Sequence, residues 1–185
     1  MLLRIKFEPF PELSTERLFL RRISMADADE MFLYRSDKEL MRYIPHRLAG
    51  SKREVEALIE EIKGKADNKE AIHWAITLKG SNTILGTVGF VRINDHHLRA
   101  ELGYMLHTPQ HGKGVMEEAC RAVIDYGFNV MKLHSIEAIV NHENIASKKL
   151  LTKLGFSNDA YFKDYLYLGG RFIDANVYSL ITPVK

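Results

Sequence analysis

Alternating apolar and polar positions predict the first strands of the chain. Residues 15–23 (TERLFLRRI) alternate in this way, as a strand with one buried face does. Further along, residues 73–79 and 83–94 flank a Gly-Ser-Asn turn at 80–82, and residues 99–107 are again extended in character. This block therefore predicts three strands in succession.

Strands are also predicted in the last third of the chain. Residues 135–140 are almost continuously apolar, which is typical of a buried strand with parallel neighbours. Residues 160–168 and 171–181 flank Gly169 and Gly170, a pattern that predicts a β-hairpin.

Helical periodicity follows two polar caps in the first half of the chain. Ser24 and Asp27 resemble a capping box that opens a helix to about Arg35. A fuller capping box at 51–54 (SKRE) opens an amphipathic helix that ends around Gly64. The apolar face of this second helix consists of Val55, Leu58, Ile59 and Ile62.

Two more helices are predicted after the strand-rich block. Residues 115–131 form a long helical pattern whose apolar side is made of Ala119, Val123, Tyr126, Gly127 and Val130. Residues 144–154 are also helical and stop at Gly155, which is well placed as a C-terminal cap. The order β-α-α-β-β-β-α-β-α-β-β predicts one α/β domain over residues 1–185 with a mixed sheet.

The composition and net charge of the chain argue against nucleic acid and membranes as partners. The 185 residues are 46% hydrophobic and 27% charged, and the formal net charge is +2. This charge is small, and basic residues are interspersed with acidic ones, so we expect neither nucleic acid nor a membrane as partner. Cys120 is the only cysteine, and the N-terminus has no long apolar core. These features fit a cytoplasmic protein without a signal peptide.

The first candidate for chemistry is the loop at 111–116 (HGKGVM), which joins the strand at 99–107 to the helix at 115–131. Its two glycines let the backbone approach a ligand closely. The first N–H groups of a helix lack intrahelical partners, and the helix dipole is positive there. We therefore expect an anion site, most naturally for phosphate. The strand-helix-strand unit places this site at the carboxyl end of the first strand, with the strand at 135–140 parallel to it.

Two nucleotide-binding motifs fit this loop poorly. A Walker loop needs a hydroxyl after the lysine, but Gly114 follows Lys113. A dinucleotide fingerprint needs a third glycine where Glu117 stands. A plain structural turn before a helix is the remaining alternative.

The motifs in their order resemble those of the GNAT acetyltransferases. Residues 101–106 (ELGYML) and 111–119 (HGKGVMEEA) resemble the acetyl-CoA-binding motif of that family, and residues 141–156 resemble its second half. The N-terminal residues 15–21 (TERLFLR) resemble the opening of the RimJ/RimL-like branch, which includes enzymes that acetylate the N-terminal α-amine of ribosomal proteins. The resemblance implies the GNAT-like acyltransferase fold and extends from about Leu13 to the C-terminus.

The resemblance implies how acetyl-CoA is held. The backbone of the loop would wrap the diphosphate, and this loop comprises His111, Gly112, Lys113, Gly114, Val115 and Met116. The backbone of Met105 and Leu106 would pair with the pantetheine arm, and Asn144 would hydrogen-bond to it. The strands at 100–107 and 135–140 are expected to separate and admit this arm. No metal is implied.

The catalytic residues follow the family pattern less closely. Many relatives have a tyrosine acid where this chain has Leu151, and some have a strand glutamate where it has Ile139. Ser147, one helical turn after Asn144, is therefore the candidate acid, with solvent as the alternative. Glu101 is the candidate base because it lies on the strand that forms the cleft.

The acceptor is expected to be a primary amine. An α-amine, with a pKa of about 7.7–8.0, needs less help to lose its proton than a lysine at roughly 10.4. The missing strand glutamate thus favours a protein N-terminus or another amine of low pKa, and a small-molecule amine stays open. Segments 24–50 and 160–172 would build its pocket. The resemblance implies a monomer or homodimer. A non-catalytic sensor of coenzyme A is the alternative function.

Each candidate also has a structural interpretation. Asn144 is a residue type that caps helices, Ser147 and Glu101 could be solvated surface residues, and Cys120 fits a small core position. His96 and His97 are adjacent and point to opposite sides of a strand, so a loop tip explains them better than a metal. Trp74 is expected in the core.

Overall fold

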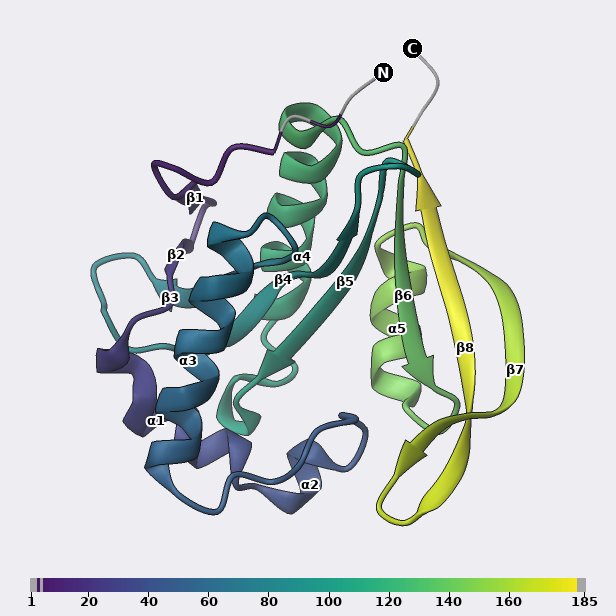
Figure 1. Cartoon of the computed structure of the whole chain (residues 1–185), viewed down its shortest axis with the longest axis horizontal. Helices are drawn as coiled ribbons and strands as arrows, with labels where there is room; N and C mark the ends of the chain where they lie inside the picture. The colour runs from purple at the N-terminus through teal and green to yellow at the C-terminus, as the bar shows by residue number, and fades with distance from the viewer. Residues whose placement is uncertain (1–2, 4, 183–185) are drawn as a thin grey trace.

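The computed structural model describes residues 3 and 5–182, and its centre is one eight-stranded mixed sheet (Figure 1). The sheet order is β1-β2-β3-β4-β5-β6-β8-β7. The strands are β1 (Leu13–Ser14), β2 (Leu18–Arg22), β3 (Ile72–Leu78), β4 (Gly86–Asn94), β5 (Arg99–Leu106), β6 (Ser135–Asn141), β7 (Ser157–Leu168) and β8 (Arg171–Ile181).

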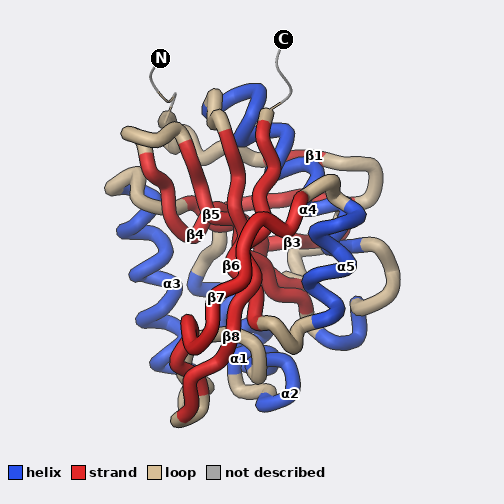
Figure 2. The backbone as a smooth tube through the Cα atoms, turned by 90° about the vertical axis from the view of Figure 1, so that its right-hand side faces the viewer, coloured by secondary structure: helices blue, strands red, loops and turns tan. Residues whose placement is uncertain are grey.

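Helices cover both faces of the sheet (Figure 2). One face carries α1 (Ala28–Arg35), α2 (Lys38–Met41) and α3 (Lys52–Asp67), and the other carries α4 (Val115–Asp125) and α5 (Ile145–Lys153). Within the described residues, no helix combines the length and apolarity needed to cross a membrane.

The predicted mixed α/β fold is confirmed, with corrections at the boundaries. Strand β6 has one parallel neighbour, β5, but its other neighbour, β8, is antiparallel. Helix α3 continues past Gly64 to Asp67, because the surroundings of Gly64 are open and buried Ala66 extends the apolar face. The two-residue strand β1 and the four-residue helix α2 are too short for periodicity to reveal.

The predicted helix at 115–131 changes its geometry halfway. It is α-helical to Asp125 and then forms one π-helical stretch, Tyr126–Met131. A π-turn holds an extra residue and so rotates the side chains that follow it. Val130 is consequently 49% exposed, so its predicted place on the apolar face is wrong.

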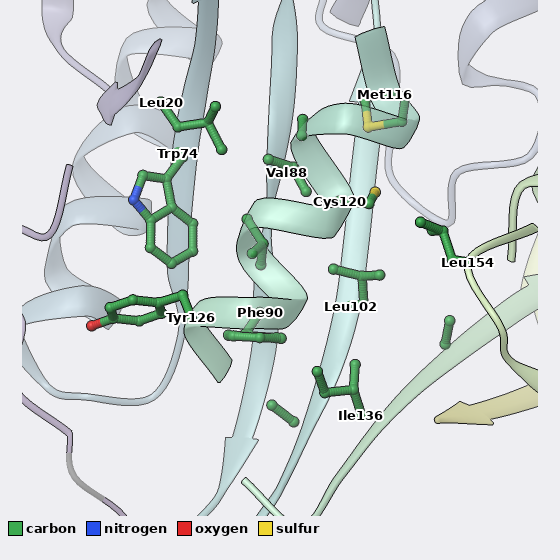
Figure 3. Close-up of a cluster of buried hydrophobic side chains, with 14 of the residues drawn as sticks. Leu20, Trp74, Val88, Phe90, Leu102, Met116, Cys120, Tyr126, Ile136 and Leu154 are labelled. Atoms are coloured by element: carbon green, nitrogen blue, oxygen red, sulfur yellow. The ribbon is translucent and has the colours of Figure 1, made fainter. Parts of the chain in front are cut away.

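A large apolar core fills the space between the sheet and α4 (Figure 3). Trp74 and Cys120 are fully buried there, as predicted. The indole Nε1 of Trp74 donates to the Pro11 carbonyl at 2.6 Å, which satisfies its polar atom. Gly127 sits where a Cβ would lie 2.7 Å from Phe90, so only glycine lets this turn lie so close to the sheet.

An ion pair joins β2 to the start of the first helical segment. Arg21 donates to both carboxylate oxygens of Asp27, at 2.6 and 2.9 Å, and also to the Asn82 carbonyl at 2.8 Å. The Asp27 carboxylate accepts the Ser24 N–H at 2.8 Å, which confirms the predicted capping contact. Burial opposes ionisation of Asp27, but the bonds from Arg21 and Ser24 outweigh it and lower the pKa of Asp27.

The Asp27→Asn variant is expected to lose about 3 kcal/mol of unfolding free energy, because it leaves the Arg21 guanidinium without its buried partner. The lowered pKa makes this contribution present above about pH 4 and lost as the pH falls through the folded-state pKa. Urea unfolding of both proteins from pH 7 to pH 2 measures it.

The matched control is Glu60→Gln, which breaks the exposed pair between Lys63 and Glu60. This change is expected to cost under about 0.5 kcal/mol. Equal losses of unfolding free energy in the two variants at pH 7 would show that the buried pair stabilises the fold no more than an exposed pair does.

Candidate active site

The site begins where β5 and β6 separate. The two strands are paired over three residue pairs, the last being Glu101 with Glu137, and their carboxyl-terminal halves then part (Figure 1). The predicted separation is therefore confirmed. A cleft of about 500 Å³ occupies this region, and its lining residues come from β5, β6 and helices on both faces of the sheet.

The open edge of β5 presents backbone groups to this gap. The His107 N–H donates to Leu85 just before β4, at 2.8 Å, so residue 107 faces that side. The backbone N–H and C=O groups of successive strand residues point alternately to the two neighbouring strands, so those of Leu106 and Tyr104 point toward β6. The Leu106 carbonyl bonds to His111 Nε2 at 2.8 Å, which ties the following loop to the strand end. Met105 has a buried side chain that lines the cleft.

The loop after β5 offers consecutive free amides. The N–H groups of residues 112–117 donate to no other residue in the described part of the chain. Gly112 and Gly114 both have φ of +74°, a left-handed conformation that favours glycine. Val115 and Met116 bury their side chains, so only their backbone faces the loop. Free amides that precede and open a helix have the geometry of an anion site, and the binding of a phosphate by this loop stays a prediction.

A contact that was not predicted holds this loop in place. The Glu118 carboxylate accepts hydrogen bonds from Thr15 Oγ1 at 2.5 Å and from Arg17 N and Nε at 2.9 and 2.7 Å. Arg17 Nη1 then donates to the Lys113 carbonyl at 3.1 Å. The segment just before β2 is thereby bonded to the loop and to the first turn of α4. Thr15 and Arg17 lie in the segment at 15–21 that resembles the family, but their partner Glu118 lies about 100 residues further along the chain.

Asn144 serves as a helix cap and also lines the cleft. Its Oδ1 accepts the Ser147 N–H at 3.1 Å, which caps α5. Its Nδ2 makes no hydrogen bond to a described residue, and the side chain reaches the cleft wall. The capping and ligand-facing interpretations of Asn144 are thus compatible.

Ser147 is joined to a residue that sequence analysis did not assign. Its hydroxyl lies 2.6 Å from the Tyr104 hydroxyl, and both residues line the cleft. Burial raises the pKa of Tyr104, so the phenol keeps its proton at neutral pH. Leu151 is fully buried, as expected of a position that carries no acid. The two hydroxyls form a short chain that could deliver a proton into the gap.

Glu101 lies beside the gap at the last paired position of β5. Its carboxylate accepts a hydrogen bond from Arg92 at 2.7 Å, and its side chain is only 18% exposed. Burial raises the pKa of Glu101, the nearby Glu137 adds to this effect, and Arg92 opposes it. By alternation along β5, Glu101 and Met105 lie on the face of α1 and α3, opposite the Tyr104 side chain.

The cleft gathers part of the predicted set. Glu101, Met105, Asn144 and Ser147 line it, whereas Leu106 and the loop at 111–116 do not. That loop follows the end of β5. Segment 24–50 contributes Tyr34, Arg35 and five further residues, and segment 160–172 contributes only Leu166. Helix α3 forms a wall that was not predicted.

Metal chemistry has no candidate ligands in the part of the chain that the structure describes. No cluster of three or more histidine, cysteine or carboxylate side chains could hold an ion there. His96 and His97 lie in the turn between β4 and β5, as predicted.

Comparisons with known proteins identify the family. Residues 17–157 match the family described as an acetyltransferase (GNAT) domain. An uncharacterized N-acetyltransferase of Bacillus subtilis, YoaA, is 35% identical over 175 residues, which cover 94% of this chain and 98% of that protein.

Solved structures agree in fold. An acetyltransferase of the GNAT family from Bacillus anthracis has a TM-score of 0.82 at 27% identity and covers 92% of this chain and 98% of its own. RimL, a ribosomal alpha-N-protein acetyltransferase in complex with coenzyme A, has a TM-score of 0.84 at 19% identity, with 92% and 98% covered. This chain belongs to the GNAT family and is an N-acetyltransferase.

Proposed function

We propose that this chain transfers the acetyl group of acetyl-CoA directly to an α-amine held in the cleft between β5 and β6. The observation that carries the proposal is the run of unpaired amides at 112–117 beside the open edge of β5. A diphosphate supplies acceptors for the amides, and an extended pantetheine arm supplies a partner for the strand edge.

The residues present fit this donor along its whole length. Lys113 is exposed and adds a positive charge at the loop surface. The Leu106 N–H and the backbone of Tyr104 face the gap, whereas the Leu106 carbonyl is bonded to His111. Asn144 Nδ2 is free to donate there. A backbone N–H in the gap would also stabilise negative charge on a carbonyl oxygen.

Two groups would handle protons. Acetyl-CoA supplies an acetyl group activated as a thioester. As the amine nitrogen bonds to the carbonyl carbon and the carbon–sulfur bond breaks, Ser147 donates its proton to the sulfur and is reprotonated through Tyr104. Glu101, directly or through a water, accepts the proton that the amine loses. The products are the acetylated amine, which is an amide, and free coenzyme A.

The acceptor side favours an α-amine over a polyamine. The charged residues of the cleft are three cations and two carboxylates: Arg35, Lys65, Arg92, Glu61 and Glu101. A second positive charge on the acceptor would meet no free carboxylate here, since Lys65 and Arg92 already pair with the two glutamates. Ile139, where some relatives have a glutamate, adds no further base.

The direct test measures release of coenzyme A thiol across a panel of peptides, amino acids and polyamines, with acetylated products identified by mass spectrometry. We expect acetylation at α-amines and little at polyamines. Tight binding of coenzyme A without thiol release for any acceptor would support the non-catalytic sensor instead.

The Gly114→Glu variant is expected to abolish coenzyme A binding, because a side chain and a negative charge would enter the amide loop at φ of +74°. Isothermal titration calorimetry measures the loss. The control is Gly80→Glu, since Gly80 has φ of +78° in a turn remote from the loop and bears the same backbone strain. If the Gly114 variant binds like the Gly80 variant, the loop does not hold the donor.

The Ser147→Ala and Tyr104→Phe variants are each expected to lower kcat by roughly tenfold or more with little change in the KM for acetyl-CoA. Because the hydroxyls act in series, the double variant should be no slower than the slower single one. Steady-state kinetics measures both parameters, and Thr152→Ala on the same helix is the control. Unchanged rates would assign the proton to solvent.

The Glu101→Gln variant is expected to lower kcat/KM and to remove an ionisation from its pH profile. Because the pKa of Glu101 is raised, this acid limb should lie above the usual glutamate range in the wild-type protein. Arg92→Gln should move the limb to still higher pH, since the Arg92 charge lowers that pKa. An identical profile in all three proteins would rule out Glu101 as the base.

A further inference from the structure

Unpaired buried polar atoms occur in side chains that line the cleft. Four buried side-chain nitrogen or oxygen atoms in the described residues have no hydrogen-bond partner: Arg22 Nε, Tyr34 Oη, Arg35 Nε and His73 Nδ1. Three of these four residues line the cleft. Because buried polar groups are almost always hydrogen-bonded, such a cluster in a cleft marks the place of a polar ligand.

Arg35 stands out among the cleft cations. Lys65 is paired with Glu61 at 2.6 Å and Arg92 with Glu101 at 2.7 Å. The Arg35 guanidinium makes neither an ion pair nor a hydrogen bond to any residue between 5 and 182. It is only partly exposed, at the end of α1. Only its Nε is buried, so the two terminal nitrogens reach the open cleft and are free to bind an anion.

The two histidines that line the cleft, His46 and His73, add no charge to that of Arg35 at neutral pH. Burial lowers the pKa of His73 to about 4, and Lys65 and His46 add to the effect. Burial, with a contribution from Arg35, also lowers the pKa of His46. Both rings are therefore neutral at neutral pH, and Arg35 leaves the cleft with an uncompensated positive charge.

Tyr34 supplies a second donor on the same helix. Tyr34 is 1% exposed, and its hydroxyl has no hydrogen-bond partner among the described residues. Burial raises the pKa of Tyr34, so the hydroxyl stays protonated and can donate. A guanidinium fork and a phenol together match the two oxygens of a carboxylate.

We propose that the acceptor is an α-amine that also bears a carboxylate, and that Arg35 and Tyr34 bind this carboxylate on the α1 wall of the cleft. The inference rests on the proposed function and names its substrate class. The carboxylate belongs either to a free amino acid or to an acidic side chain near a peptide N-terminus. A polyamine is excluded from this class because its second charge would face Arg35.

The experiment compares matched acceptors that differ only in the carboxylate. One pair is glutamine, which has an α-carboxylate, and its α-amide, which does not. The other pair is two tripeptides with glutamate or glutamine at the second position. The wild-type protein is expected to show kcat/KM roughly tenfold or more higher for the carboxylate member of at least one pair. The pair that shows the preference identifies the source of the carboxylate.

The variants assign this preference to Arg35. Arg35→Gln should reduce kcat/KM for the carboxylate acceptor to that of its neutral partner, with the KM for acetyl-CoA unchanged. Arg35→Lys should restore part of the preference, because it keeps the charge but loses the planar fork. The control Arg53→Gln removes the same charge from an exposed position of α3 outside the cleft and should leave the preference intact.

Tyr34→Phe separates binding from folding. Removing a buried hydroxyl that has no partner should not lower the melting temperature. The variant should still raise the KM for the carboxylate acceptor several-fold, about the effect of one hydrogen bond to a charged group. A lowered melting temperature with an unchanged KM would show that the hydroxyl has a structural role instead.

Different results would overturn the carboxylate site and the proposed acetylation of α-amines. If the wild-type protein acetylates both members of each pair equally, or if Arg35→Gln keeps the preference, the carboxylate site is overturned while α-amine acetylation stands. If coenzyme A binds but no α-amine on the panel is acetylated, the proposed function fails, and the acceptor site fails with it.

Discussion

The parting of β5 from β6 is the constraint on which the site depends. Two central strands of a sheet normally satisfy each other's backbone groups along their full length, but here pairing stops after Glu101 and Glu137. The sheet remains intact because β4 holds β5 on one side and β8 holds β6 over seven pairs on the other. Each separated strand is thus held by its outer neighbour while its inner edge stays unpaired.

The same geometry explains why so many polar groups are kept near the gap. The amide loop leaves the end of β5 and is fixed from two sides, by His111 on the Leu106 carbonyl and by Arg17 on the Lys113 carbonyl. Glu118 would repel an anion at the start of α4, but its carboxylate is taken up by Thr15 and Arg17. The loop therefore holds its amides in a fixed arrangement, as the proposed binding of a diphosphate requires.

The two faces of the sheet supply different chemistry to one cleft. Tyr104 and Ser147 approach from the face of α4 and α5, where a proton donor for a leaving thiolate would act. Glu101, Tyr34 and Arg35 approach from the face of α1 and α3, where an acceptor amine would enter. Alternation along β5 separates these roles, because neighbouring residues of a strand point to opposite faces.

Local patterns in the sequence determined the order of elements, the glycine loop and the cap at Asn144, because periodicity, capping and turn chemistry act over a few residues. Which side chains meet was decided only by the tertiary structure. Tyr104 and Ser147 lie 43 residues apart, and Thr15 and Glu118 lie 103 apart, so no local pattern links them. Arg35 is an ordinary helix-end arginine in sequence. Its lack of a partner became visible only once the packing of α1, α3 and the sheet had placed every other charge of the cleft.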